Sequence, residues 1–327
     1  MNFNNLVIVG GSRNQELVKK IASKLYPAEI VIIDTAPWPN GQARCIRPVD
    51  TTFNDKVVFI VTSLQYKGYN SPIEELKLIY SCCKAAREIH IVISWFCGKD
   101  DVKHLSGQIP VAPFMANEIK SLEPKTILLH DLHQSSQTGY FYNRVSDVKH
   151  FYLLGKLIKI AQTRGVDQIA ATDFSSSNRA GKVDGFLKTG HPIILASKMH
   201  DYLQTNAITS QLLLGEVVGK KIAFFDDMAL SLKTLVGAAE VLRKIAPAVE
   251  IETYVVHFDP SEDAYERLKI ALEEKVINNF FTTNTCEIEK RFQVIPCFNI
   301  IDVSDFIARA IELIVTGRST KELFLDI

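Results

Sequence analysis

The chain has 327 residues, a length that suffices for two domains. Its residues are 47% hydrophobic and 23% charged, a composition that excludes an intrinsically disordered protein. Lys plus Arg and Asp plus Glu number 37 each, so bulk charge favours neither nucleic acid nor a membrane surface as a partner.

Short β-branched runs alternate with helical patterns along the chain. In the first half we expect strands at residues 6–10, 29–33, 57–62, 89–94 and 126–129, and helices at 15–25, 73–87 and 111–122. In the second half we expect strands at 168–172, 192–196, 221–225, 250–256 and 279–283, and helices at 152–162, 233–245 and 264–274. This alternation predicts the α/β class, with mainly parallel sheets and right-handed crossovers.

We place a domain boundary after residue 148, which divides the chain into domains of residues 1–148 and 149–327. The boundary precedes a helical pattern that opens near His150, and no low-complexity linker marks it. The last helix is a candidate for packing back on the first domain.

The cysteines form no CxxC pair and no spacing typical of a zinc site. They are Cys45, Cys82, Cys83, Cys97, Cys286 and Cys297. We predict reduced core thiols in a reducing compartment. No apolar run approaches about 18 residues, and no basic segment followed by a long apolar run opens the sequence. We therefore expect a cytoplasmic protein without a membrane span.

Polar side chains follow several predicted strands, at the sheet edge where parallel α/β sheets bind ligands. Asp226 and Asp227 come after residues 221–225, and adjacent carboxylates suit ribose hydroxyls or hydrated Mg²⁺. A turn with a helix N-cap is the structural alternative for them. His133, Asp173 and Lys198 follow three other strands, where a single such residue is typical of a solvated loop. Together these positions suit a metal-bound polyphosphate and a transferring group.

The segment at residues 131–141 begins Asp-Leu-His-Gln and ends Gly-Tyr-Phe. It resembles the Asp-Leu-His segment of the ribose-phosphate pyrophosphokinases, or PRPP synthetases. Order and spacing of further motifs are similar along most of the chain. The resemblance implies two phosphoribosyltransferase-type, Rossmann-like domains, and it makes His133 a ligand of Mg-ATP.

In the second half, Asp173 resembles the acid of the family's Ser-Pro-Asp segment, near ribose and metal, and Arg179 falls where members carry an Arg-containing helix that we assign to ATP. Lys198 matches the lysine that opens the catalytic loop, although the two following arginines are absent. Asp226 and Asp227 match the two acids that hold the ribose hydroxyls. The implied reaction moves the β,γ-diphosphoryl group of ATP to the C1 hydroxyl of ribose 5-phosphate, mostly by positioning and charge stabilisation.

Three segments depart from the family. The loop that cradles the 5-phosphate contains glycine in the family, whereas residues 230–234 read Leu-Ser-Leu-Lys-Thr. Ser231, Lys233 and Thr234 still suit an anion, but a backbone cradle without glycine binds it differently. In place of the family's Arg-Gln-Asp-Arg-Lys segment, which grips ATP, the chain has Lys99, Asp101 and Lys103.

The third departure concerns the family's Phe-Ser-Asp-Gly-Glu segment, which reaches a neighbouring subunit's adenine. It reads Trp-Pro-Asn-Gly-Gln at residues 38–42, so Asn40 and Gln42 keep the shape of the acids without their charge. We assign Trp38 and Phe96 to stacking on a nucleotide base. The family also implies a homo-oligomer, a dimer or a hexamer.

Two functions remain open, and a phosphoribosyltransferase that consumes PRPP is disfavoured by the missing phosphate loop. The first is a diphosphokinase that uses Mg-ATP and a 5-substituted acceptor such as ADP-ribose, which the family resemblance associates with viral NAD salvage. The second is a catalytically inactive regulatory relative, since the lost arginines each remove transition-state stabilisation.

Two further patterns predict structure only. Glu74, Glu75, Lys84 and Arg87 share the predicted helix at 73–87, which indicates a solvated face. Residues 9–12 read Val-Gly-Gly-Ser and predict a tight turn, since the signature of a dinucleotide or P-loop site does not follow.

Overall fold

The computed structural model describes residues 3–66, 71–98, 107, 109–145, 147–174, 176–200 and 208–324, with the side chains of residues 197–200 and 208–211 outside this description. The chain forms two compact units. Unit 1 comprises residues 1–152, 285–287 and 302–326, and unit 2 comprises residues 153–284 and 288–301 together with residue 327. The predicted boundary after residue 148 falls inside a strand of unit 1, and the division lies after Tyr152.

Unit 1 is built on a six-stranded sheet in which all pairs are parallel. In spatial order its strands are β2 (Glu29–Ile32), β1 (Leu6–Gly10), β3 (Val57–Ser63), β4 (Glu88–Trp95), β5 (Thr126–His130) and β6 (Asp147–Phe151). The order reverses direction between β1 and β3. At such a switch point two loops diverge at the carboxyl edge of the sheet.

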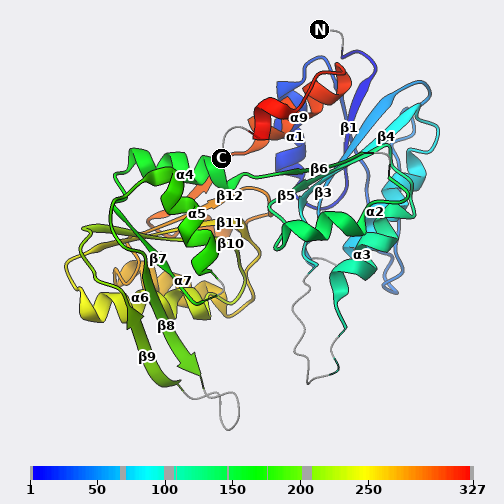
Figure 1. Ribbon diagram of the computed structural model, residues 1–327. Coiled ribbons are helices and arrows are strands. Elements are labelled where there is room, and N and C mark those ends of the chain that lie inside the picture. The colour runs from blue at the N-terminus through cyan, green and yellow to red at the C-terminus, as the bar shows by residue number, and fades with distance from the viewer. Residues whose placement is uncertain are drawn as a thin grey trace. The chain divides into compact units, whose positions relative to one another are not determined.

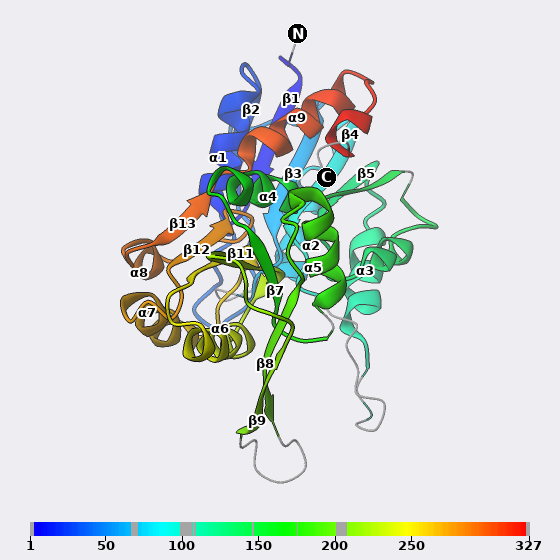
Figure 2. The same cartoon turned by 60° about the vertical axis from the view of Figure 1, so that its left-hand side comes forward.

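Helices cover both faces of this sheet, as Figures 1 and 2 show. They are α1 (Gln15–Lys24), α2 (Pro72–Cys82), α3 (Val111–Lys120) and α9 (Ser304–Val315), with 3-10 turns η1 (Ser135–Tyr140) and η2 (Lys321–Phe324). The helices α1 and α9 pack together, so the last long helix belongs to unit 1. Alternate strand residues such as Val7, Val9 and Ile60 form a core with the apolar sides of α2 and α3.

The carboxyl edge of the unit 1 sheet is filled by a buried polar network centred on Glu75. Its carboxylate accepts hydrogen bonds from the Ser12 N–H at 2.6 Å, the Ser12 hydroxyl at 2.9 Å and the Thr35 hydroxyl at 2.8 Å. It also pairs with Arg13. A Cβ atom at position 11 would collide with this carboxylate, so Gly11 is needed for the close approach.

The prediction of a solvated helix face at Glu75 is therefore wrong, because this residue is 2% exposed and points into the network. Helix α2 ends at Cys82, so Lys84 and Arg87 lie beyond it.

Unit 2 is built on a seven-stranded sheet that is parallel except for its last pair. In spatial order its strands are β13 (Phe298–Ile301), β12 (Asn279–Thr283), β11 (Glu250–Phe258), β10 (Lys221–Ala229), β7 (Gln168–Ala171), β8 (Ile194–His200) and β9 (Ile208–Leu214). The switch point lies between β7 and β10. The antiparallel pair β8–β9 extends away from the sheet as a two-stranded ribbon (Figure 2).

Five helices accompany this sheet. They are α4 (Leu154–Thr163), α5 (Ser177–Leu187), α6 (Lys233–Ile245), α7 (Ala264–Glu273) and α8 (Lys290–Gln293). The apolar sides of α6 and α7 form one core with strand residues such as Ile222, Phe224 and Ile251. On the opposite face Phe225, Tyr254 and Phe281 stack across three neighbouring strands, with ring centroids 4.8 and 4.7 Å apart.

The α/β class with mainly parallel sheets is confirmed, but three strands, β6, β9 and β13, were not predicted. Among the described residues, no helix combines the length and apolarity needed to cross a membrane. The cysteines are all free, yet only Cys83 and Cys286 are buried, so the prediction of core thiols holds for two of the six.

Replacing Glu75 by Ala should destabilise unit 1 by about 3 kcal/mol or more, because Arg13, Ser12 and Thr35 would lose the buried carboxylate that they share. Both tryptophans, Trp38 and Trp95, belong to unit 1, so their fluorescence during urea unfolding reports on this unit. The exposed neighbour Glu74 provides the matched control, Glu74→Ala. A Glu75→Ala midpoint equal to that of the control would contradict the account.

Candidate functional site

The strongest polar arrangement of unit 2 lies at its switch point. Arg179, on α5, directs its guanidinium at the carboxylates of Asp226 and Asp227 on β10. One amino group pairs with Asp226, and Nη2 lies 2.8 Å from Asp227 Oδ1. Asp226 also accepts a hydrogen bond of 3.0 Å from the Asp227 N–H. One guanidinium thus holds two adjacent carboxylates in a fixed fork, the geometry that Arg favours.

Asp226 and Asp227 were predicted to follow a strand, but β10 continues to Ala229 and contains both. Burial raises the pKa of Asp226 to about 8, while Arg179 opposes the rise and the neighbouring Asp227 adds to it. The half-buried Asp226 and the buried Asp227, with one guanidinium, carry a net negative charge when both carboxylates are ionised. The pair is therefore suited to accept hydrogen bonds from hydroxyl groups rather than to bind anions.

The side chain of Asp173, which follows β7, stabilises the local backbone. Its Oδ1 accepts a hydrogen bond of 2.8 Å from the Ser176 N–H, and the Ser176 hydroxyl donates to the Asp173 carbonyl at 2.9 Å. These bonds close the turn that leads into α5, and so they orient the helix that carries Arg179. Arg179 was assigned to ATP, whereas the structure brings it to the acidic pair.

The segment at residues 230–234, where the family has its phosphate loop, is fixed by unit 2 itself. Leu232 adopts a left-handed conformation, with φ 60° and ψ 1°, and its side chain is 4% exposed in the core. The Leu230 carbonyl accepts a hydrogen bond of 3.1 Å from the Ser261 N–H, and the Ser231 carbonyl accepts one from Arg267. The backbone is thus held in place at two carbonyls.

The anion-binding capacity of this segment is confined to its exposed end. The Ser231 hydroxyl accepts a bond of 3.5 Å from the Lys233 N–H, while Lys233 and Thr234 are exposed in the first turn of α6. A helix start and a lysine favour negative charge, but no glycine lets the backbone wrap a phosphate closely.

Lys198 was expected in a loop after a strand, but it lies inside β8, opposite Gln211 of β9. The prediction of a loop is wrong because β8 continues to His200. Its side chain lies outside the described residues, so its catalytic role stays a prediction.

In unit 1, His133 lies half-buried in the turn between β5 and η1. Strand β6 holds this turn on both sides. The Asp131 N–H donates to the Phe151 carbonyl at 3.0 Å, and the Leu132 N–H donates to His150 Nε2 at 3.0 Å. Burial lowers the pKa of His150 to about 4, so its imidazole is neutral and can accept this bond. His133 is therefore presented by a turn of defined conformation.

The predicted adenine segment is an exposed turn in unit 1. The Trp38 N–H donates to the Gln42 carbonyl at 2.9 Å, and Asn40 Oδ1 accepts from the Gln42 N–H at 3.1 Å. The indole of Trp38 is 50% exposed and lies 5.3 Å from the guanidinium carbon of Arg44. Its ring is thus partly exposed, and its stacking on a base stays a prediction.

Phe96 does not suit the predicted stacking role. Its ring is 1% exposed and packs edge-on against Phe141 in the core, with centroids 5.5 Å apart. A buried phenyl ring offers no face to a nucleotide. Three further residues predicted to bind ATP, Lys99, Asp101 and Lys103, lie outside the described residues.

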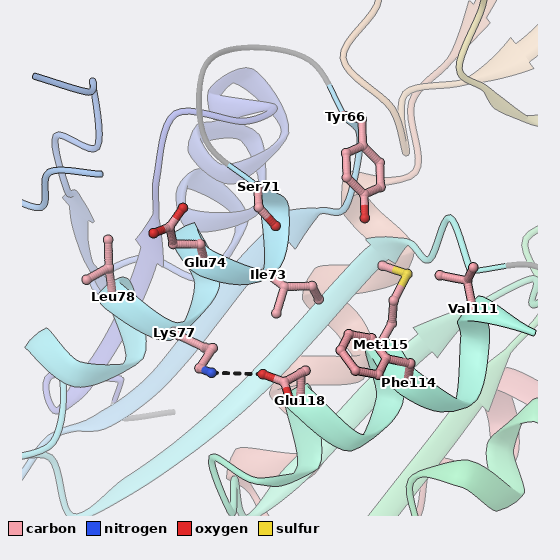
Figure 3. Close-up of a pocket in the computed structure, with 10 residues that line it drawn as sticks. All are labelled: Tyr66, Ser71, Ile73, Glu74, Lys77, Leu78, Val111, Phe114, Met115 and Glu118. Carbon is pink, nitrogen blue, oxygen red and sulfur yellow. Dashed lines mark hydrogen bonds and ion pairs between the residues drawn. The ribbon is translucent and has the colours of Figure 1, made fainter. Parts of the chain in front are cut away.

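A pocket of about 650 Å³ lies between α2 and α3 of unit 1. Figure 3 shows Ile73 of α2 and Phe114 of α3 at its wall, with Lys77 Nζ 2.8 Å from Glu118 Oε2. None of the predicted site residues lines this pocket, so we do not assign it to the site.

The described residues contain no group of three or more His, Cys, Asp or Glu side chains arranged to hold a metal ion. In unit 2 Asp226 and Asp227 are paired with Arg179, and Asp173 caps a turn. Mg²⁺ commonly keeps several waters and binds through one or two carboxylates together with substrate phosphates. An Mg²⁺ ion that arrives with ATP needs few protein ligands, and the assignment of His133 and of Asp173 to it stays a prediction.

Sequence reasoning missed the residues that support the site. These are His150, Ser261 and Arg267, which fix the backbone of two site loops. From the sequence, His150 was interpreted only as the start of a helix, because β6 was not predicted. Ser261 and Arg267 are distant in sequence from the loop they hold, and no spacing rule reveals such contacts.

Both units are Rossmann-like α/β folds with mainly parallel sheets, and unit 2 carries an acidic pair at its switch point. A phosphoribosylpyrophosphate synthetase from Mycobacterium smegmatis has a similar fold, with a TM-score of 0.82, 21% identity, and coverage of 96% of this chain and 99% of that one.

Sequence comparisons find similar proteins along the whole chain. The model of the phosphoribosyl synthetase-associated domain matches residues 195–325. A ribose-phosphate pyrophosphokinase of Fusobacterium nucleatum is 26% identical over 332 residues, with 99% of each chain covered. Ribose-phosphate pyrophosphokinase 4 of Saccharomyces cerevisiae is 24% identical, over 99% of this chain and 96% of its own. The chain is thus similar to ribose-phosphate pyrophosphokinases over nearly its whole length, which confirms the resemblance.

The raised pKa of Asp226 predicts a pH dependence of stability. The folded state binds this proton more tightly than the unfolded state, so the stabilisation is complete below the ordinary pKa and is lost as pH rises toward about 8. Asp226→Asn should remove this slope, as measured by calorimetry at several pH values. The exposed Glu266→Gln in the same unit should keep it. Parallel curves for Asp226→Asn and the wild type would contradict the assignment.

Proposed function

We propose that the chain is a diphosphokinase that transfers the β,γ-diphosphoryl group of Mg-ATP to the anomeric hydroxyl of a ribose 5-phosphate moiety. The acceptor C1 oxygen attacks the β-phosphorus, the bond to the α-phosphate oxygen breaks, AMP leaves, and the hydroxyl proton is released. The similarity to ribose-phosphate pyrophosphokinases and the preserved acidic pair support this reaction.

The proposed roles follow from the two half-sites. In unit 2, Asp226 and Asp227 accept hydrogen bonds from the ribose 2- and 3-hydroxyls, and Arg179 sets their orientation. Lys198 stabilises the charge on the transferring group. In unit 1, His133 contacts Mg-ATP, and Trp38, Asn40 and Gln42 contact the adenine. Bound Mg²⁺ would neutralise phosphate charge; the protein's own part is to orient the reactants and exclude water.

The proposed choice of acceptor rests on the conformation of Leu232. A 5-phosphate monoester carries nearly two negative charges at neutral pH and needs several N–H donors around it. Here a buried leucine takes the left-handed position, and Ser261 and Arg267 hold the neighbouring carbonyls. The segment can offer the start of α6 and the exposed Lys233 and Thr234, but it cannot fold around the phosphate without leaving the core.

A 5-phosphate esterified within a diphosphate carries one negative charge fewer at that group and requires fewer donors. It also continues into a second group that can bind elsewhere and supply the missing affinity. We therefore propose a 5-substituted acceptor, with ADP-ribose as the probe, in place of free ribose 5-phosphate.

The direct assay incubates the full chain with Mg-ATP and either ADP-ribose or ribose 5-phosphate, and identifies products by mass spectrometry. ADP-ribose should yield AMP together with a product that is heavier by one diphosphoryl group. Robust diphosphorylation of ribose 5-phosphate with none of ADP-ribose would overturn the proposed acceptor. It would leave the diphosphokinase reaction intact.

Lys198→Ala should lower kcat by roughly 100-fold or more with little change in KM, because the lysine is proposed to act on charge that develops in the transition state. Steady-state AMP formation measures both constants. Lys182 lies exposed on α5, so Lys182→Ala serves as the matched control and should keep wild-type kcat. Equal kcat values for the two variants would remove Lys198 from the mechanism.

A catalytically inactive regulatory relative is the second candidate. The occupation of both Asp226 and Asp227 by Arg179 favours it, since an acceptor must share these carboxylates with the guanidinium. Absence of AMP formation with either acceptor, combined with co-purification with an active synthetase, would select this candidate.

A further inference from the structure

Two thiols of unit 1 lie unusually close together. Cys45 belongs to the segment between β2 and β3, and Cys82 is the last residue of α2. Their sulfur atoms are 3.3 Å apart, although 37 positions separate them in the chain. Both side chains are half-buried and pack at the border of the core. We infer that Cys45 and Cys82 form an oxidisable dithiol that closes to a disulfide with two-electron oxidants of the peroxide class.

The local geometry favours this one pairing. A disulfide has a sulfur–sulfur distance of about 2.05 Å, so closure needs a movement of little more than 1 Å. Cys83, the next residue in the chain, is the competing partner, but its side chain is fully buried in the core of unit 1. Of these three thiols, the partly exposed Cys45 and Cys82 are the ones that an oxidant in solution can reach.

The chemistry balances without a protein-bound cofactor. The thiolate of one cysteine attacks a peroxide oxygen, which gives a sulfenic acid and releases the other oxygen as water or alcohol. The second thiol then attacks the sulfenic sulfur and expels water, so two thiols lose two electrons and two protons. Burial and the adjacent Cys82 thiol raise the pKa of Cys45 to about 12, which keeps this pair reduced against mild oxidants at neutral pH.

The bond would clamp the segment that carries Trp38. At one end of this segment, the Thr35 hydroxyl is bonded to Glu75 in the first turn of α2, at 2.8 Å. At its other end, Arg44 stacks on Trp38 and pairs with Asp34 at 2.6 Å, directly before Cys45. Glu75 and Cys82 lie seven residues apart, about 10 Å along the helix. A Cys45–Cys82 bond would therefore fasten the segment at both ends of α2.

Peroxide treatment of the full chain tests the pairing. The exposed Cys297 is first replaced by Ser to prevent links between molecules, which leaves five of the six thiols. Prolonged exposure to hydrogen peroxide at mildly alkaline pH, which raises the thiolate fraction, should reduce the titratable thiols, counted in denaturant, from five to three, and dithiothreitol should restore them. Trypsin should release residues 45–56 linked to residues 78–84.

Two variants in this background decide which cysteine is the partner. Cys83→Ala should still form the linked peptides, and Cys82→Ala should not. A link that survives in Cys82→Ala would overturn the proposal, and so would oxidation of Cys45 to sulfinic acid without any link.

Stability gives a second readout that does not depend on enzymatic activity. The disulfide closes a loop of 38 residues, so the melting temperature of unit 1, followed by Trp38 and Trp95 fluorescence, should rise by roughly 5–10 °C on oxidation. Trypsin should also cut after Arg44 more slowly in the oxidised chain. In Cys82→Ala, peroxide should change neither value. An oxidised wild type with unchanged melting and cleavage would show that the bond does not clamp this segment.

Discussion

The contact between Arg179 and the Asp226–Asp227 pair determines how the second unit can work. Two carboxylates side by side on one strand repel each other, and burial raises the pKa of Asp226. The guanidinium of Arg179 pairs with both and offsets their repulsion at the switch point. Its own position depends on the turn closed by Asp173 and Ser176 at the start of α5. The proposed ribose site is thus a preorganised arrangement built from two neighbouring strands and one helix.

The equivalent edge of the unit 1 sheet is occupied by different groups. There Glu75 enters from α2 and is satisfied by Ser12, Arg13 and Thr35, so protein groups fill the position where the second unit keeps its acidic pair. The residues proposed to contact nucleotide in unit 1 lie instead on turns, at Trp38 and at His133. The two units share a sheet architecture. The proposed site residues of unit 2 lie at the edge of its sheet, whereas those of unit 1 lie on turns.

Much of this could be predicted from the sequence, and the failures have physical causes. The strongly apolar strands and the helix at residues 233–245 follow from hydrophobic periodicity alone. Strand β6 was missed because its residues, Asp-Val-Lys-His-Phe, show little apolar character and gain their place by pairing with β5. Phe96 was predicted to stack on a base because its position after a strand says nothing of the core packing that buries it. The contact of Arg179 with the acidic pair was not predicted, because the resemblance supplied only its assignment to ATP.

The central claim is that residues 230–234 cannot cradle a free 5-phosphate because the buried Leu232 holds them in the core. Titration calorimetry of the wild type and Leu232→Gly, with ADP-ribose and with ribose 5-phosphate in the presence of Mg²⁺ and a non-hydrolysable ATP analogue, tests it most directly. The wild type should bind ADP-ribose more tightly than ribose 5-phosphate. The Leu232→Gly variant should gain affinity for ribose 5-phosphate, so that its two affinities differ less. Tighter binding of ribose 5-phosphate by the wild type, with no change in the variant, would contradict the account.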